Sequence, residues 1–177
     1  YAPGDDRAER TALLKYLKSK DITLEQMTEA GLVIAGPDIA EPYDRFRNRV
    51  MFPIADARGR VIAFGGRALS ADAKAKYLNS PETPLFHKGR VLYNLNRARK
   101  PAHDEGTVIA VEGYMDVVGL AQGGIMNAVA PLGTALTEDQ IQLLWRMSPE
   151  PVLCFDGDKA GLRAAYRAVE RVLPLLK

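Results

Sequence analysis

The segment Thr107-Val-Ile-Ala-Val-Glu-Gly-Tyr-Met-Asp116 decides the fold. Its first five residues form a continuous apolar run of the kind that is buried in a parallel sheet, and the pattern then continues as a helix from about 114 to 122. The same order of strand and helix recurs twice downstream. We therefore expect an α/β fold with a small parallel sheet, flanking helices and right-handed crossovers.

The two later units begin at Asn127-Ala-Val-Ala130 and at Pro151-Val-Leu-Cys-Phe155. In the strand-and-helix repeat that begins at Asn127, Thr137 and Gln140 form a capping box, which predicts a helix that starts there. The periodicity of the apolar residues predicts one inward face for each of the last two helices. The first of these faces consists of Ile141, Leu144 and Met147, and the second consists of Leu162, Ala165, Val169 and Val172. The single cysteine, Cys154, lies in the third apolar run, so we expect a buried thiol.

Upstream, the chain divides into two further stretches. Residues 1–42 predict short helices, with a capping box at Thr23 and Gln26 and a helix stop at Gly31. Residues 43–104 predict a basic, strand-rich part of the same N-terminal subdomain, because apolar runs at 49–54 and 60–64 flank a turn sequence. Residues 105–177 hold the α/β units described above.

Three acidic residues follow directly on predicted strands. Glu112 comes after the first strand, and Asp156 and Asp158 come after the third, which places all three at the edge where open α/β sheets bind their ligands. An all-carboxylate cluster favours a hard cation such as Mg²⁺ or Mn²⁺. Taken singly, Asp158 is also typical of a helix cap and Asp156 of a turn, so these two alternatives stay open.

The net charge of +2 conceals an uneven distribution. Residues 43–100 contain 13 lysines and arginines against four acids, a local charge of +9, and the rest of the chain carries −7. Such a stretch favours contact with polyanions, although a solvated sheet face explains the charge equally well. Arg45, Arg47 and Arg49 alternate, which predicts one shared face if this segment is a strand.

Several classes of protein lose their support in this sequence. We find no G-x-x-x-x-G-K-[ST] motif, no G-x-G-x-x-G after a strand, and no pattern of a histidine-based catalytic triad. No run approaches the roughly 20 apolar residues that a membrane span needs. We therefore expect a soluble cytoplasmic protein with no membrane partner.

The strand-end glutamate in Val111-Glu-Gly-Tyr-Met-Asp116 and the later Asp156-Gly-Asp158 resemble the Toprim domain, which primases, topoisomerases and some nucleases share. Four upstream segments are similar, nearly residue for residue, to bacterial primases of the DnaG type: Tyr43 to Ile54, Gly59 to Arg67, Lys76 to Thr83 and Phe86 to Arg90. The resemblance covers residues 43 to 177 and is weaker before them.

The resemblance implies synthesis of short RNA primers from ribonucleoside triphosphates on single-stranded DNA, by a replisome-associated enzyme of the bacterial nucleoid. It implies that Glu112, Asp156 and Asp158 bind catalytic Mg²⁺ or Mn²⁺ and that Asp116 supports them. For binding of DNA and nucleotides we expect a set of mostly basic residues: Arg45, Arg47, Arg49, Arg67, Lys76, Tyr77, Asn79, Lys88 and Arg90.

In this family zinc belongs to an amino-terminal ribbon domain, and contacts with the replicative helicase and with single-stranded DNA-binding protein belong to other regions. The family also has a later acidic motif, so the metal site in this stretch is expected to be incomplete, and whether the stretch alone is active stays open. Two alternatives remain at this point. One is another Toprim protein, a topoisomerase or a nuclease; the other is a non-catalytic fragment that binds nucleotides or single-stranded DNA.

Overall fold

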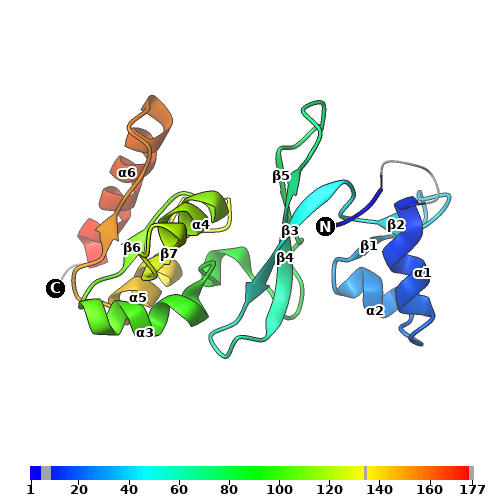
Figure 1. Ribbon diagram of the computed structural model, residues 1–177, viewed down its shortest axis with the longest axis horizontal. Helices are drawn as coiled ribbons and strands as arrows, with labels where there is room; N and C mark the ends of the chain where they lie inside the picture. Colours follow the sequence, from blue (N-terminus) through cyan, green and yellow to red (C-terminus); the bar gives the residue numbers. More distant parts are fainter. Residues whose placement is uncertain (5–8, 134, 176–177) are drawn as a thin grey trace. The chain divides into compact units, whose positions relative to one another are not determined.

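The computed structural model describes residues 1–4, 9–133 and 135–175 (Figure 1). The chain groups into two compact units. The first comprises Tyr1–Ile54 and Val61–Phe86, and the second comprises Ala55–Arg60 and the chain from His87 onward.

The first unit contains two small antiparallel arrangements of strands and two short helices. Its elements are η1 (Glu9–Thr11), α1 (Ala12–Lys18), α2 (Leu24–Glu29), β1 (Val33–Ile34), β2 (Tyr43–Asp44), β3 (Arg49–Ala55), β4 (Val61–Ala68) and β5 (Tyr77–Asn79). Strand β1 pairs with β2, and a separate sheet has the order β3-β4-β5. The predicted hairpin at 49–64 is confirmed as β3 and β4.

Local signals explain how the helices of the first unit begin and end. Thr23 accepts a hydrogen bond from the backbone N–H of Gln26 at 3.2 Å, and the Gln26 side chain accepts one from the N–H of Thr23 at 2.9 Å, so the predicted capping box is confirmed. Helix α1 starts differently, because the buried carboxylate of Asp44 on β2 accepts hydrogen bonds from the N–H groups of Leu13 and Leu14 at 2.7 and 2.9 Å. This tie fixes α1 against the β1–β2 pair.

The second unit carries the predicted α/β layer. Its elements are η2 (Lys88–Arg90), α3 (Leu95–Glu105), β6 (Ile109–Ala110), α4 (Tyr114–Gln122), β7 (Ala128–Val129), α5 (Glu138–Trp145), β8 (Val152–Leu153), α6 (Lys159–Val172) and η3 (Leu173–Leu175). Helix α3 joins this unit because Leu95, Ala98 and Ala102 pack into its core. The second compact unit therefore includes the chain from His87 onward, whereas the domain boundary near 104 stays a prediction.

The sheet of the second unit has the order β7-β6-β8, and both pairings are parallel, as predicted. Because side chains alternate across a strand, the central segment buries both of its faces. Val108 and Ala110 join the core formed with α3, α5 and α6, whereas Ile109 and Val111 pack with residues of α4. Helix α4 accordingly covers the face opposite α3 (Figure 1).

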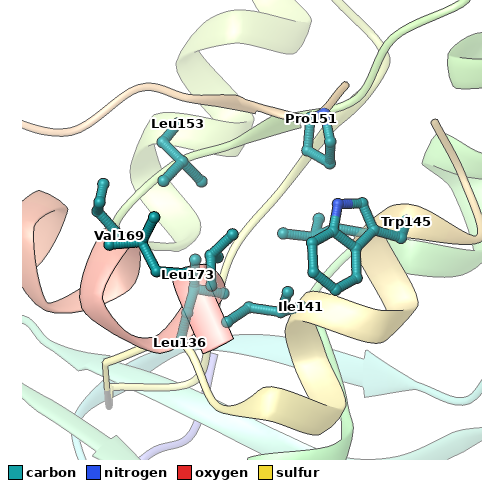
Figure 2. A pocket seen from close by; sticks show the side chains of 9 residues that line it. Leu136, Ile141, Trp145, Pro151, Leu153, Val169 and Leu173 are labelled. Carbon is teal, nitrogen blue, oxygen red and sulfur yellow. The ribbon is translucent and has the colours of Figure 1, made fainter. Parts of the chain in front are cut away.

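The inward face predicted for the third helix is only partly correct. Ala165 and Val172 are half-buried, but Leu162 and Val169 are about half exposed, and the buried residue of this helix is Ala168, which was not part of the predicted face. Val169 instead lines an open apolar cavity of about 210 Å³ between α5, β8 and α6, which Figure 2 shows with Trp145, Leu153 and Leu173 around it. Its nine lining residues carry no charge, so the cavity does not suit a phosphate-bearing ligand.

The prediction of a buried Cys154 is wrong, because this thiol is exposed. Strand β8 lies at the edge of the sheet, where only β6 pairs with it. Val152 and Cys154 are two residues apart and share one side of the strand, and no described element covers that side.

Within the described part of the chain, no helix combines the length and the apolar character that crossing a membrane would require.

Candidate functional site

Two of the predicted acidic residues meet at the carboxyl ends of neighbouring strands. The backbone pairing of β6 with β8 continues past the strands, with the N–H of Cys154 donating to the carbonyl of Ala110 at 2.9 Å. The chain then brings the N–H of Asp156 to the side chain of Glu112, which accepts a hydrogen bond through Oε1 at 2.9 Å. Glu112 and Asp156 are thus adjacent although 44 positions separate them in the sequence.

Asp158 caps the helix that follows, as its alternative interpretation predicted. Its Oδ1 accepts hydrogen bonds from the N–H groups of Ala160 and Gly161, both at 2.8 Å, so it forms the N-cap of α6. These two donors hold the pKa of Asp158 below its ordinary value, because they stabilise the ionised carboxylate. A cap at this position also keeps a negative charge beside Asp156.

Asp116 holds the turn that follows Glu112. Its Oδ2 accepts a hydrogen bond from the N–H of Gly113 at 2.8 Å, at the start of α4. The residue directly after Glu112 is therefore fixed by a side chain one turn further along. This contact supports the position of Glu112, whereas the structure shows no contact between the two carboxylates themselves.

Gly161 is a residue of this site that the sequence did not reveal. A Cβ built on it would lie 2.7 Å from Oε1 of Glu112 and closer still to the carbonyl oxygen of Asp156. The first turn of α6 thus approaches the Glu112 carboxylate and the Asp156 backbone carbonyl as closely as a glycine allows. Its only signal in the sequence was a glycine inside a predicted helix, where glycine is normally unfavourable.

The acidic edge does not form a ready-made metal cage. Among residues 1–4, 9–133 and 135–175, no group of three histidine, cysteine or acidic side chains lies close enough to hold a metal ion. The donor chemistry nevertheless fits a hard divalent cation, because Glu112, Asp156 and Asp158 offer carboxylate oxygens only. An ion bound here would require these side chains to draw together.

The first unit gathers several of the predicted nucleic-acid-binding residues around β5. Tyr77 and Asn79 lie on this strand, which pairs with β4 so that Arg67 stands opposite Tyr77. Lys76 precedes the strand, and its ammonium lies 6.0 Å from the centre of the Tyr77 ring. Tyr77 and Arg67 are both exposed.

The prediction that Arg45, Arg47 and Arg49 alternate along one strand is wrong. Strand β2 ends at Asp44 and β3 begins at Arg49, because Asn48 adopts a positive φ of 49° that breaks the extended conformation between them. The three guanidinium groups consequently have three different surroundings.

Arg49 is buried and binds backbone rather than solvent. Its guanidinium donates to the carbonyl oxygens of Gly66 at 3.1 Å, Ala75 at 2.9 Å and Lys76 at 3.4 Å. Burial lowers the pKa of Arg49, and the nearby charge of Arg47 lowers it further. The side chain therefore ties the segment before β5 to β4.

Arg45 and Arg47 have less buried surroundings. Arg45 donates to the carbonyl of Asn79 at 3.3 and 3.4 Å, and burial lowers its pKa. The guanidinium of Arg47 stacks on the ring of Tyr43, 4.6 Å from its centre. Arg45 and Arg49 thus hold the two ends of the β5 segment.

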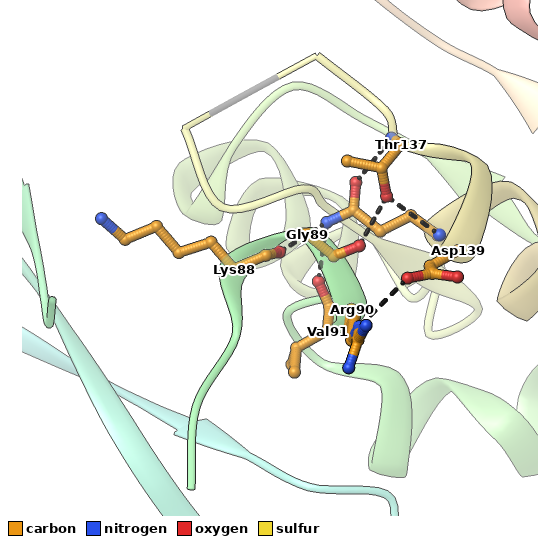
Figure 3. A network of polar contacts seen from close by, with 7 residues as sticks. Lys88, Gly89, Arg90, Val91, Thr137 and Asp139 are labelled. Carbon is orange, nitrogen blue, oxygen red and sulfur yellow. Dashed lines mark hydrogen bonds and ion pairs between the residues drawn. The ribbon is translucent and has the colours of Figure 1, made fainter. Parts of the chain in front are cut away.

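Lys88 and Arg90 belong to the second unit, in the short turn η2. Arg90 forms an exposed ion pair with Asp139 at 3.2 Å, and the side chain of Lys88 extends away from the polar contacts around it (Figure 3). The turn is attached to the start of α5, whose capping box at Thr137 and Gln140 is confirmed.

Comparisons with known proteins identify both parts of the chain. The family model of the DNA primase catalytic core, N-terminal domain, matches residues 1–99, and that of the Toprim domain matches residues 106–176. A DNA primase of Pseudomonas aeruginosa is 57% identical over 165 residues, which cover 93% of this chain and 25% of that relative. The chain thus spans about a quarter of the length of the curated relatives it matches.

Solved structures agree with this assignment. The crystal structure of a DNA primase domain from Pseudomonas aeruginosa has a TM-score of 0.88 at 55% identity and covers 99% of this chain and 53% of that one. A DnaG primase catalytic domain bound to single-stranded DNA has a TM-score of 0.81 at 51% identity and covers 91% of this chain and 50% of that one. Since the primase model alone matches more than half of the residues, this chain belongs to the DNA primase catalytic core family, with a Toprim domain in its second unit.

Proposed function

We propose that this chain provides part of the polymerase centre of a bacterial primase, which joins ribonucleoside triphosphates into a short RNA primer on a single-stranded DNA template. The observation that carries the proposal is the contact between Glu112 and Asp156 at the ends of β6 and β8. The match to the N-terminal primase model favours this activity over that of a topoisomerase or a nuclease, because the Toprim domain alone does not distinguish them.

We assign divalent cation binding to Glu112, Asp156 and Asp158, with Mg²⁺ or Mn²⁺ as the ion. Ions held by these carboxylates would supply charge stabilisation to the oxygens that react in nucleotidyl transfer. The hydrogen bonds that keep Asp158 ionised suit this role, since a ligand must be deprotonated to bind.

We assign to Glu112 either a bridging role at the cations or the handling of the proton of the primer 3′-hydroxyl. It is half-buried, follows the central strand and lies beside Asp156, so its carboxylate is held where strand ends of the sheet converge. Proton transfer by such a positioned group contributes about 10²–10⁴-fold to a rate. Asp116 contributes indirectly by fixing the backbone at Gly113.

For the template and the incoming nucleotide we assign different tasks to the basic residues. Arg67, Lys76, Lys88, Arg90 and Arg47 are the candidates for phosphate contacts, because phosphate neutralisation supplies most sequence-independent affinity. Tyr77 offers a ring for base stacking and Asn79 a polar group for a base edge. Arg45 and Arg49, which bind carbonyl oxygens, instead hold β5 in place.

The test is primer synthesis by the full-length protein with labelled ribonucleotides on single-stranded DNA, with and without Mg²⁺. Glu112→Gln keeps an oxygen that accepts from Asp156 but removes the charge, so we expect a loss of synthesis of at least about 100-fold. Binding of template, followed by fluorescence anisotropy of a labelled oligonucleotide, should stay within twofold of the wild type.

Glu105→Gln supplies the matched control, because Glu105 is an exposed acid at the end of α3 in the same unit. It should leave both synthesis and binding unchanged. If Glu112→Gln retained synthesis, the assignment of this carboxylate to the reaction would be wrong, whatever the control showed.

A further inference from the structure

Gln140 makes more contacts than a capping box needs. It is fully buried at 0% exposure, which is unusual for a glutamine. Its Oε1 accepts from the N–H of Thr137 at 3.1 Å, which is the capping contact. Its Nε2 donates at 2.9 Å to the carbonyl oxygens of both Lys88 and Val91, which are about 50 positions upstream.

Thr137 adds a second connection to the same turn. Its hydroxyl donates to the carbonyl of Gly89 at 2.5 Å while it accepts from the N–H of Gln140 at 3.2 Å (Figure 3). A Cβ on Gly89 would lie 3.3 Å from the methyl group of Thr137, so the turn packs tightly on the start of α5. The carbonyl groups of Lys88, Gly89 and Val91 are thus all bound by two side chains of one helix terminus.

The exposed ion pair between Arg90 and Asp139 adds little to this attachment. Both side chains are more than half exposed, at 71% and 57%, and such pairs contribute little to stability. The buried amide is the stronger constraint, because both donors of a buried amide must find acceptors and here both do.

We propose that Gln140 is a positioning residue for template binding: it locks the turn η2 so that Lys88 is presented to a phosphate of the DNA strand. The inference rests on the proposed function, since it assumes that Lys88 binds phosphate. Gln140 itself is buried, so it acts through the carbonyl groups of Lys88 and Val91, to which its amide donates.

The decisive variant is Gln140→Glu. A glutamate at this position keeps the oxygen that the capping box requires, because glutamate and glutamine serve equally there. It replaces the two donated hydrogen bonds to Lys88 and Val91 with contacts between oxygens. Gln140→Met, which removes the donors without adding charge, provides a second variant of similar size.

The chain contains its own matched control in the other capping box. Gln26 occupies the same position relative to Thr23 as Gln140 does to Thr137, but it is exposed. Gln26→Glu makes the same chemical change and the same change in net charge, while it leaves η2 untouched.

The experiment measures the affinity of the full-length protein for a labelled single-stranded oligonucleotide at several KCl concentrations, and the kcat and KM of primer synthesis. We expect Gln140→Glu and Gln140→Met each to raise the KM for template, to leave kcat unchanged, and to reduce the slope of log K against log salt by about 0.7, the value of one phosphate contact on a single strand. Gln26→Glu should leave the KM, the kcat and the salt slope at their wild-type values.

A double-mutant cycle with Lys88→Ala separates positioning from a general loss of structure. If Gln140 acts through Lys88, either substitution at 140 should add nothing in the Lys88→Ala background. Full additivity of the two effects, or a wild-type slope in both Gln140 variants, would overturn the inference about Gln140 and leave the proposed function standing. An unchanged slope in Lys88→Ala by itself would instead contradict the assignment of Lys88 to the template, and the inference would fail with it.

Discussion

At the scale of single residues, Gly161 sets how closely α6 approaches the carboxylate of Glu112 and the backbone carbonyl of Asp156. Because a Cβ there would overlap the carbonyl of Asp156 and lie 2.7 Å from Glu112, the backbone of Gly161→Ala must move away from both. We expect a loss of stability of about 1–3 kcal/mol, typical of overpacking, and a fall in primer synthesis that exceeds what this instability explains. Urea denaturation and primer synthesis, measured on the same preparation, test this.

Gly119→Ala is the control, since Gly119 also lies inside a helix but its Cβ would meet nothing within 4 Å. Alanine is the better helix former, so this variant should be more stable by about 0.5–1 kcal/mol and fully active. Equal behaviour of the two alanine variants would show that the close approach at Gly161 has no consequence.

Single residues also show where sequence reasoning stops. The positions of Glu112 and Asp156 followed from strand ends, because the carboxyl ends of parallel strands meet at one edge. The closeness of Gly161 and the exposure of Cys154 depend on how α6 crosses the sheet and on which strand lies at its edge. The periodicity of apolar residues, two in strands and 3.6 in helices, reveals neither the crossing of the helix nor the order of the strands.

At the scale of elements, β5 depends on Arg49. Its side chain lies against Gly66, whose missing Cβ would come within 2.9 Å of it, and its guanidinium binds three carbonyl oxygens. We expect Arg49→Ala to destabilise the first unit by roughly 1.5–3 kcal/mol, because buried acceptors lose a charged donor. Thermal unfolding monitored by circular dichroism gives the size of this loss.

Arg67→Ala should behave in the opposite way. Arg67 is exposed on β4 opposite Tyr77, so its removal should weaken template binding and leave the unfolding midpoint nearly unchanged. If Arg49→Ala instead left stability intact and weakened binding alone, Arg49 would be a phosphate ligand, as its charge in the sequence first suggested.

Elements with local signals were predicted well, and so was the parallel sheet of the second unit, because its strands lie in continuous apolar runs. Both capping boxes, the hairpin and helix α4 follow from residues within a few positions of one another. The pair β1–β2, in which Val33 lies opposite Asp44 and Ile34 opposite Tyr43, was missed because two-residue strands carry almost no periodicity. The shared strand face predicted for Arg45, Arg47 and Arg49 was wrong, because one residue in the left-handed conformation, Asn48, ends the extended backbone.

At the scale of the whole molecule, the uneven charge is compatible with a nucleic-acid ligand but does not by itself distinguish it from a solvated basic surface. The basic stretch at 43–100 is shared between the two compact units, so neither unit alone holds all the candidate phosphate contacts. The uneven distribution of charge is counted directly from the sequence, but the sequence does not show which basic side chains face solvent and which bind backbone carbonyl groups. Arg49 and Lys76, close together around the same segment, illustrate the two outcomes.

Substitution of Lys76 tests whether a basic side chain affects DNA binding through a local phosphate contact or only through the net charge of the protein. Lys76 is exposed at the start of β5, beside Tyr77, and we expect Lys76→Ala to reduce the salt slope of single-stranded DNA binding by about 0.7, because one phosphate contact is lost. Lys15→Ala removes an equal charge from the exposed side of α1 in the same unit. Anisotropy titrations over a range of KCl concentrations should show the wild-type slope for Lys15→Ala, and equal reductions in both variants would mean that β5 offers no specific phosphate site.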